Sequence, residues 1–157
     1  MVFREIHNAK RALPREAAED IMRSGSHGVL ALEGDDQYPY AVPLNYAYDG
    51  DRVWFHCALE GHKLDALARN PRVSFCVVTA DDVHPEGFTT RYASAIAFGQ
   101  ARLAANDDEK RHGLQLLANK YCYQIPERHQ KVIEGNLART CVFLLEVEHL
   151  SAKANQR

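Results

Sequence analysis

The residues from Tyr40 to Tyr48 constrain the fold most, because apolar side chains recur there at every second position. In an extended chain this two-residue period places five side chains on one face: Tyr40, Val42, Leu44, Tyr46 and Tyr48. Such a pattern predicts a half-buried β-strand whose apolar face belongs to a core.

The segment that follows the alternation predicts a hairpin. Asp49-Gly50 is a strong two-residue turn signal, and Val53 to Cys57 forms the return arm. Pro43 interrupts the first arm and cannot donate a ladder hydrogen bond, so we expect an edge position or a bulge there.

The rest of the chain predicts further strands and a few short helices. Strands are expected in "HGVLALEG", "VSFCVVTA", "YASAIAFGQARLAA" and "ARTCVFLLEVEHLSAK". Helices are expected in "LPREAAEDIMRSGSHG", "GHKLDALARNPRV", "NDDEKRHGLQLLANKYC" and "PERHQKVIEG", with Asn106 as a cap. Residues 81–91 are predicted to be a polar loop, either a plain surface loop or a lid over a site.

Six or so strands that are mostly neighbours in sequence indicate a mainly β fold, an antiparallel β-barrel decorated by helices. A doubly wound parallel sheet fits less well, because helices and strands do not alternate. We find no internal repeat or low-complexity linker in the 157 residues, which predicts a single domain over 1–157.

Composition excludes several classes of function. The formal net charge of −2 gives no basic field for nucleic acid, and no apolar run is long enough for a membrane. The first residues lack the apolar segment of a signal peptide, so a cytoplasmic protein is expected. The cysteines are widely spaced, which indicates reduced thiols and no metal site. They are Cys57, Cys76, Cys122 and Cys141.

The stretch "FHCALEGHKLDAL" is a candidate anion site. A helix start offers free N–H groups, and Gly61 lets an anion approach the backbone. Lys63 adds a charge, while His56 and His62 add hydrogen-bond donors. The simpler alternative is an ordinary exposed helix start. Upstream, the irregular edge around Asn45 leaves backbone groups for a flat polar ring, although periodicity alone favours core positions for its neighbours.

Several segments together resemble the pyridoxamine 5′-phosphate oxidase-like split-barrel flavoproteins, and within them the nitroimidazole-resistance branch. They are "GVLAL", "YPYAVPLNYAYDGDRVWFHCALEGHKLDAL", "NPRVSF" and "TTRYASAIAFGQARL". The resemblance implies a six-stranded split barrel and a homodimer with FMN at its interface. It also implies a set of cofactor-binding residues: Pro43, Leu44, Asn45, Tyr46, His56, Gly61, His62, Lys63, Tyr92 and Ser94.

Two features depart from that family. Ala93 stands where a basic or polar residue is common, and the tail "HLSAKANQR" has no substrate-phosphate cluster like that of true pyridoxamine-phosphate oxidases. Vitamin B6 oxidation is therefore not expected. The function expected is an FMN-dependent oxidoreductase that reduces a flat electron-poor acceptor such as a nitroaromatic or a quinone.

Two other functions remain open at this stage. One is a non-catalytic flavin- or haem-binding sensor or carrier on the same barrel, and the other is a related barrel that uses a deazaflavin. No residue is assigned a catalytic role, although His27, His56 and His62 are candidates by residue type because histidine titrates near neutral pH.

Overall fold

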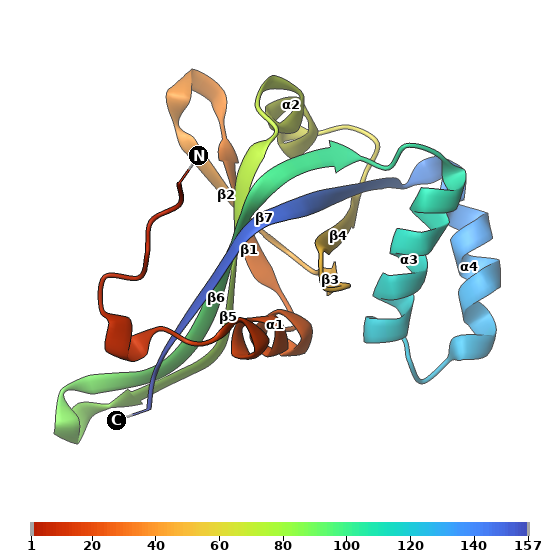
Figure 1. The fold of residues 1–157 in the computed structure, drawn as a ribbon. Coiled ribbons are helices and arrows are strands. Elements are labelled where there is room, and N and C mark those ends of the chain that lie inside the picture. The colour runs from red at the N-terminus through yellow and green to blue at the C-terminus, as the bar shows by residue number, and fades with distance from the viewer. Residues whose placement is uncertain (1, 157) are drawn as a thin grey trace.

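The computed structural model describes residues 2–156 and shows one antiparallel sheet curled around an apolar core (Figure 1). The strand order in the sheet is β2-β1-β5-β6-β7-β4-β3. The strands are β1 (Gly28–Glu33), β2 (Pro39–Leu44), β3 (Ala47–Tyr48), β4 (Arg52–Cys57), β5 (Arg72–His84), β6 (Thr89–Leu103) and β7 (Cys141–Asn155). The predicted barrel architecture is confirmed, with seven strands in place of six because β3 forms a short strand of its own.

The core explains why these residues fold into a barrel. Aromatic side chains from three strands meet at its centre, where the Phe55 ring lies 4.8 Å from Phe143 and 5.0 Å from Phe75. All three side chains are fully buried. The alternating face of residues 40–48 packs against this cluster as predicted, with the Tyr46 ring in edge contact with Phe75 at 4.8 Å.

The predicted hairpin over residues 38–57 is only partly correct. β2 pairs along its whole length with β1, and only Ala47–Tyr48 pairs with β4. The chain therefore leaves one end of the sheet at Leu44 and joins the other end at Ala47. β2 is an edge strand, which agrees with the position expected for Pro43.

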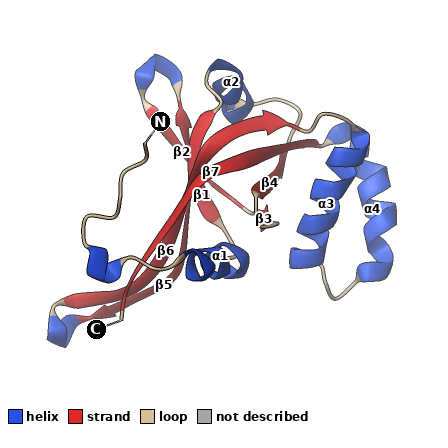
Figure 2. Ribbon diagram, in the orientation of Figure 1, coloured by secondary structure: helices blue, strands red, loops and turns tan. Residues whose placement is uncertain are grey.

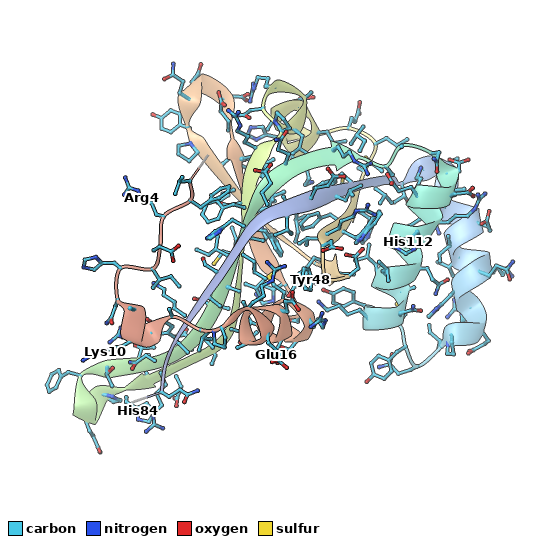
Figure 3. All side chains as sticks on the ribbon, in the orientation of Figure 1. Arg4, Lys10, Glu16, Tyr48, His84 and His112 are labelled. Atoms are coloured by element: carbon cyan, nitrogen blue, oxygen red, sulfur yellow. The ribbon has the colours of Figure 1, made fainter. Side chains whose placement is uncertain are left out.

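The predicted loop at residues 81–91 is wrong. β5 continues to His84 and β6 starts at Thr89, so only a short 3-10 turn at Pro85–Gly87 separates two long strands. These polar residues pair with each other outside the barrel, where neither face meets a core. The two strands form an arm that projects beyond the barrel, with His84 near its tip (Figures 1 and 3).

Residues 2–156 form four α-helices, which lie around the sheet (Figure 2). They are α1 (Arg15–Ser24), α2 (His62–Arg69), α3 (Asp107–Tyr121) and α4 (His129–Asn136). Asn106 caps α3 as predicted, because its Oδ1 accepts from the Glu109 N–H at 2.9 Å. Helices α3 and α4 form a hairpin beside the barrel, and His112 of α3 contacts the buried Trp54 ring at 5.2 Å (Figure 3).

The last strand runs further than the sequence indicates. β7 extends to Asn155, two residues beyond the segment predicted to be a strand, and pairs with β6 up to Tyr92. Among residues 2–156, no helix combines the length and the apolar character that a membrane span requires.

Candidate functional site

The predicted cofactor residues fall into three places in the structure. Gly61, His62 and Lys63 lie at the start of α2, and Asn45 and His56 line a cavity beside α3 and α4. The remaining residues belong to β2 and β6 or to the core.

The start of α2 has the features that an anion site requires. Gly61 adopts φ 145°, a conformation that favours glycine, and an added Cβ there would have nothing within 4 Å. The first helical hydrogen bonds come from Leu64 and Asp65 to the Gly61 carbonyl, and no side chain caps the helix. The N–H groups of His62 and Lys63 precede these bonds, so they are available to an anion.

The side chains of His62 and Lys63 at this junction have different surroundings. The His62 ring stacks on Tyr40 at 4.0 Å, and its Nε2 lies 3.7 Å from the Asp35 carboxylate. His62 therefore faces the start of β2. Lys63 is half-buried, and its charge partly opposes the rise that burial causes in the pKa of the Cys57 thiol. Lys63 is thus the cation that remains for a ligand at the Gly61 turn.

A cavity of about 480 Å³ lies between β4 and the α3–α4 hairpin. Its lining is Asn45, His56, Leu114, Leu117, Ala118, Tyr121, Cys122, Val132, Ile133, Asn136 and Thr140. This volume is typical of small-molecule sites, and the mix of an apolar floor with a few polar groups is also typical. No Asp, Glu, Lys or Arg belongs to this lining, so the cavity suits an uncharged ligand.

His56 faces this cavity because of the strand period of β4. The neighbouring Phe55 and Cys57 point to the barrel side, whereas His56 points to the side of Trp54 and the helix hairpin. Partial desolvation lowers the pKa of the His56 imidazole, which favours its neutral form. His56 therefore lines this cavity, whereas Lys63 of α2 does not, and their common place near one phosphate stays a prediction.

The segment that carries Asn45 and Tyr46 is fixed by groups from α1 and α3. The Asn45 side-chain amide donates to the Ser26 carbonyl at 2.9 Å, and the Tyr46 hydroxyl donates to Met22 at 2.6 Å. The Tyr121 hydroxyl donates to the Ser26 carbonyl at 2.6 Å and accepts from the Tyr46 N–H at 3.0 Å.

Lys120 completes this network. Its Nζ donates to the Tyr46 carbonyl at 3.0 Å and lies 3.7 Å from the centroid of the Tyr46 ring. Burial lowers the pKa of Lys120 to about 8. Both backbone polar groups of Tyr46 are thus already engaged within the chain, and its ring is fully buried. Tyr46 does not line the cavity itself, but it holds Tyr121, which does.

The sequence did not identify Lys120 and Tyr121 as site residues. They lie on a helix about seventy positions away, and no local pattern distinguishes them from other polar residues of that helix. Only the packing of α3 against β3 and β4 brings them to Tyr46.

We predict that Tyr121→Phe destabilises the fold by about 1–3 kcal/mol, because the variant leaves the Tyr46 N–H without its acceptor and removes one of the two donors to the Ser26 carbonyl. Chemical denaturation of both proteins measures this difference. The matched control is Tyr123→Phe, whose side chain is mostly exposed, and it should change stability by less than about 0.5 kcal/mol. Equal effects of the two variants would contradict the network.

The other predicted residues lie on different surfaces. Pro43 is exposed on β2, while Leu44 packs against the core. Ser94 faces away from the core, paired in register with Lys153. Tyr92 accepts from the Arg11 guanidinium at 3.3 Å and lies near the base of the β5–β6 arm. None of these four residues lines the cavity at His56.

The whole arrangement is similar to several known proteins. The structure of the FAD- and haem-binding protein from Mycobacterium smegmatis superposes with a TM-score of 0.78, at 26% identity over 94% of this chain and 74% of that one. A candidate 5-nitroimidazole antibiotic resistance protein from Bacteroides thetaiotaomicron gives a TM-score of 0.75, at 20% identity over 91% of this chain and 86% of that one.

A similarity in sequence is also found with an uncharacterized protein of Rhizobium meliloti. It is 38% identical over 64 residues, and the match spans 41% of this chain and 41% of that protein. A family model described as pyridoxamine 5′-phosphate oxidase matches residues 14–154. Because this match covers most of the chain, from α1 almost to the end of β7, the chain belongs to the pyridoxamine 5′-phosphate oxidase family.

Proposed function

We propose that this protein is an FMN-dependent oxidoreductase that passes electrons to a flat, uncharged, electron-poor acceptor such as a nitroaromatic or a quinone. The observation that carries the proposal is the uncapped start of α2, where the open turn at Gly61 stands beside Lys63. These groups fit a phosphate, because backbone N–H groups and a lysine are its usual partners.

The cavity at His56 supports the choice of acceptor. Its lining offers an apolar floor, a neutral imidazole and an amide, but no carboxylate or ammonium group. A charged substrate would lose its hydration there without an ion partner, which is costly. The cavity therefore favours a neutral aromatic molecule, with Asn45 and His56 as hydrogen-bond partners.

We place the flavin ring along Pro43 to Asn45, next to this cavity. Asn45 connects the two places, since it directly follows the edge strand β2 and also lines the cavity. Bound FMN would supply the electrons of the reaction, while the protein binds and orients both reactants. Asn45 is suited to orienting because its amide is held on Ser26. We assign no proton donor.

A homodimer with the cofactor at its interface belongs to the same proposal. The outer face of the sheet carries Pro43 opposite Val29, and Val29 opposite Cys76. Val29 is 39% exposed and Val78 on the same sheet is 53% exposed. Apolar exposure of this kind suits a contact with a second copy, which would bring Ser94 and Tyr92 of one protomer toward the cofactor.

The test of the phosphate site is Lys63→Ala. We expect this variant to bind FMN more weakly by about 1–3 kcal/mol, roughly 5- to 150-fold, because a charge-assisted hydrogen bond is lost. Fluorescence titration of the apoprotein with FMN measures this affinity. Lys131→Ala is the matched control, since Lys131 is exposed on α4. Unchanged affinity in Lys63→Ala would place the phosphate elsewhere.

A second candidate function is a haem-binding sensor or carrier. The observation that favours it is the neutral imidazole of His56 on the wall of an open cavity, because neutral imidazole is the form that ligates iron. The similar Mycobacterium smegmatis structure is described as FAD- and haem-binding. Titration with haem decides between the two. A Soret shift that His56→Gln abolishes supports haem, and a flavin spectrum without it supports the oxidoreductase.

A further inference from the structure

Two cysteines that lie far apart in the sequence face each other in the sheet. Cys57 is the last residue of β4 and Cys141 is the first residue of β7. They are direct partners in the antiparallel ladder between these strands. Both thiols are free in the structure, and the Cys57 thiol donates to the Ala58 carbonyl at 3.2 Å.

This register meets the geometric requirement of a disulfide. Directly opposed residues of an antiparallel pair have Cα atoms about 4.5–5.5 Å apart, and disulfides join Cα atoms at about 4.4–6.8 Å. Partners in such a pair also project to the same face of the sheet, so the two thiols lie on one side of it.

The other two cysteines have no such partner among the described residues. Cys76 lies in the middle of β5, opposite Val29 and Ile96. Cys122 is exposed at the end of α3. The pairing of Cys57 with Cys141 is therefore specific to the ends of β4 and β7.

We propose that Cys57 and Cys141 form a redox-responsive dithiol. It is oxidised to an intramolecular disulfide by a low-molecular-weight disulfide such as oxidised glutathione. One cysteine attacks a glutathione sulfur and releases the first reduced glutathione, and the second cysteine then displaces the other. The protein loses two electrons and two thiol protons, and two reduced glutathione molecules carry them.

The position of this bond gives it a consequence for the loop that follows. Cys57 directly precedes the residues that lead to Gly61 and Lys63, so the crosslink would tie this loop to the start of β7. Formation of the disulfide does not depend on the proposed function. An effect of the disulfide on FMN affinity does rest on the proposed function.

The surroundings also predict how fast the exchange runs. Burial raises the pKa of the Cys57 thiol to about 11, with the neighbouring Cys141 acting in the same direction. Little of the reactive thiolate is therefore present at neutral pH. We expect slow exchange near pH 7 and faster exchange as the pH rises toward that pKa.

Peptide mapping of the oxidised, intact protein tests the proposal. The folded protein is incubated with oxidised glutathione at mildly alkaline pH, its remaining thiols are blocked with iodoacetamide, and it is digested without reduction. We expect a linked pair of peptides carrying Cys57 and Cys141, about 2 Da lighter than the sum of the reduced peptides. This pair should disappear after reduction.

Variants that each replace one cysteine by serine show which thiols form the link. Cys57→Ser and Cys141→Ser should each abolish the linked pair, whereas Cys76→Ser should retain it. Circular dichroism before oxidation verifies that each variant is folded. A glutathione adduct that persists on Cys57, a link through Cys122 to a second molecule, or full labelling of both thiols by iodoacetamide would overturn the proposal.

Discussion

Phe55→Ala is expected to destabilise the protein by about 3–5 kcal/mol, the usual cost of deleting a fully buried phenylalanine ring. The ring stacks on Phe143 at 4.8 Å and meets the edge of Phe75 at 5.0 Å, so its removal leaves a cavity between three strands. A loss of this size is a large part of the stability of a small domain. Chemical denaturation monitored by circular dichroism measures it.

The matched control for this prediction is Phe88→Ala. Phe88 is 98% exposed at the tip of the β5–β6 arm, and its removal should change stability by less than about 0.5 kcal/mol. If Phe55→Ala does not fold, Phe55→Leu keeps part of the volume and should cost less. A Phe55→Ala protein as stable as the parent would contradict the position of the core.

Gly99→Ala is the second variant with a large expected effect. Overpacking should lower its free energy of unfolding by about 3 kcal/mol. An added Cβ at residue 99 would lie 1.9 Å from the Glu146 carbonyl oxygen, a backbone atom that cannot rotate away. The sheet register shifts between Phe98 and Gly99. The two longest paired strands cross closely at that bulge, so relief of the clash would disturb both.

Gly135→Ala is the control, and its expected change in stability has the opposite sign. Gly135 lies within α4, where an added Cβ would have nothing within 4 Å. Alanine is favoured over glycine in a helix by roughly 0.5–1 kcal/mol, so this variant should be slightly more stable than the parent. Thermal unfolding of the two variants side by side tests the pair. Stabilisation by Gly99→Ala would contradict the close approach of β6 and β7.

Local patterns in the sequence predicted the features that depend on neighbouring residues. The two-residue period placed Tyr40, Val42 and Leu44 on a core face, because alternation follows directly from strand geometry. The cap at Asn106 was equally local. The pairing partner of β2 was not predictable in this way, since the choice between β1 and β4 depends on the closure of the whole sheet.

Polarity misled the interpretation of residues 81–91. Asp81 and Asp82 suggested a loop, but strands that pair outside a barrel need no apolar face. The candidate site was also only partly predictable from local sequence patterns. Gly61 and Lys63 were identified from their local pattern, whereas the cavity at His56 and its support by Tyr121 depend on how the α3–α4 hairpin packs.

The contact between Cys57 and Cys141 was likewise not predictable from the sequence. Nothing in the spacing of Cys57 and Cys141 indicates contact, and the wide spacing instead suggested four separate reduced thiols. Only the register of β4 with β7 brings the two side chains together.

The most direct test of the central claim is the absorbance spectrum of the freshly purified protein, combined with mass spectrometry of the small molecule that it releases on denaturation. The account predicts a flavin band at about 450 nm and released FMN. A protein that is purified without flavin and also fails to bind added FMN would contradict it, and the start of α2 would then be an ordinary exposed helix terminus.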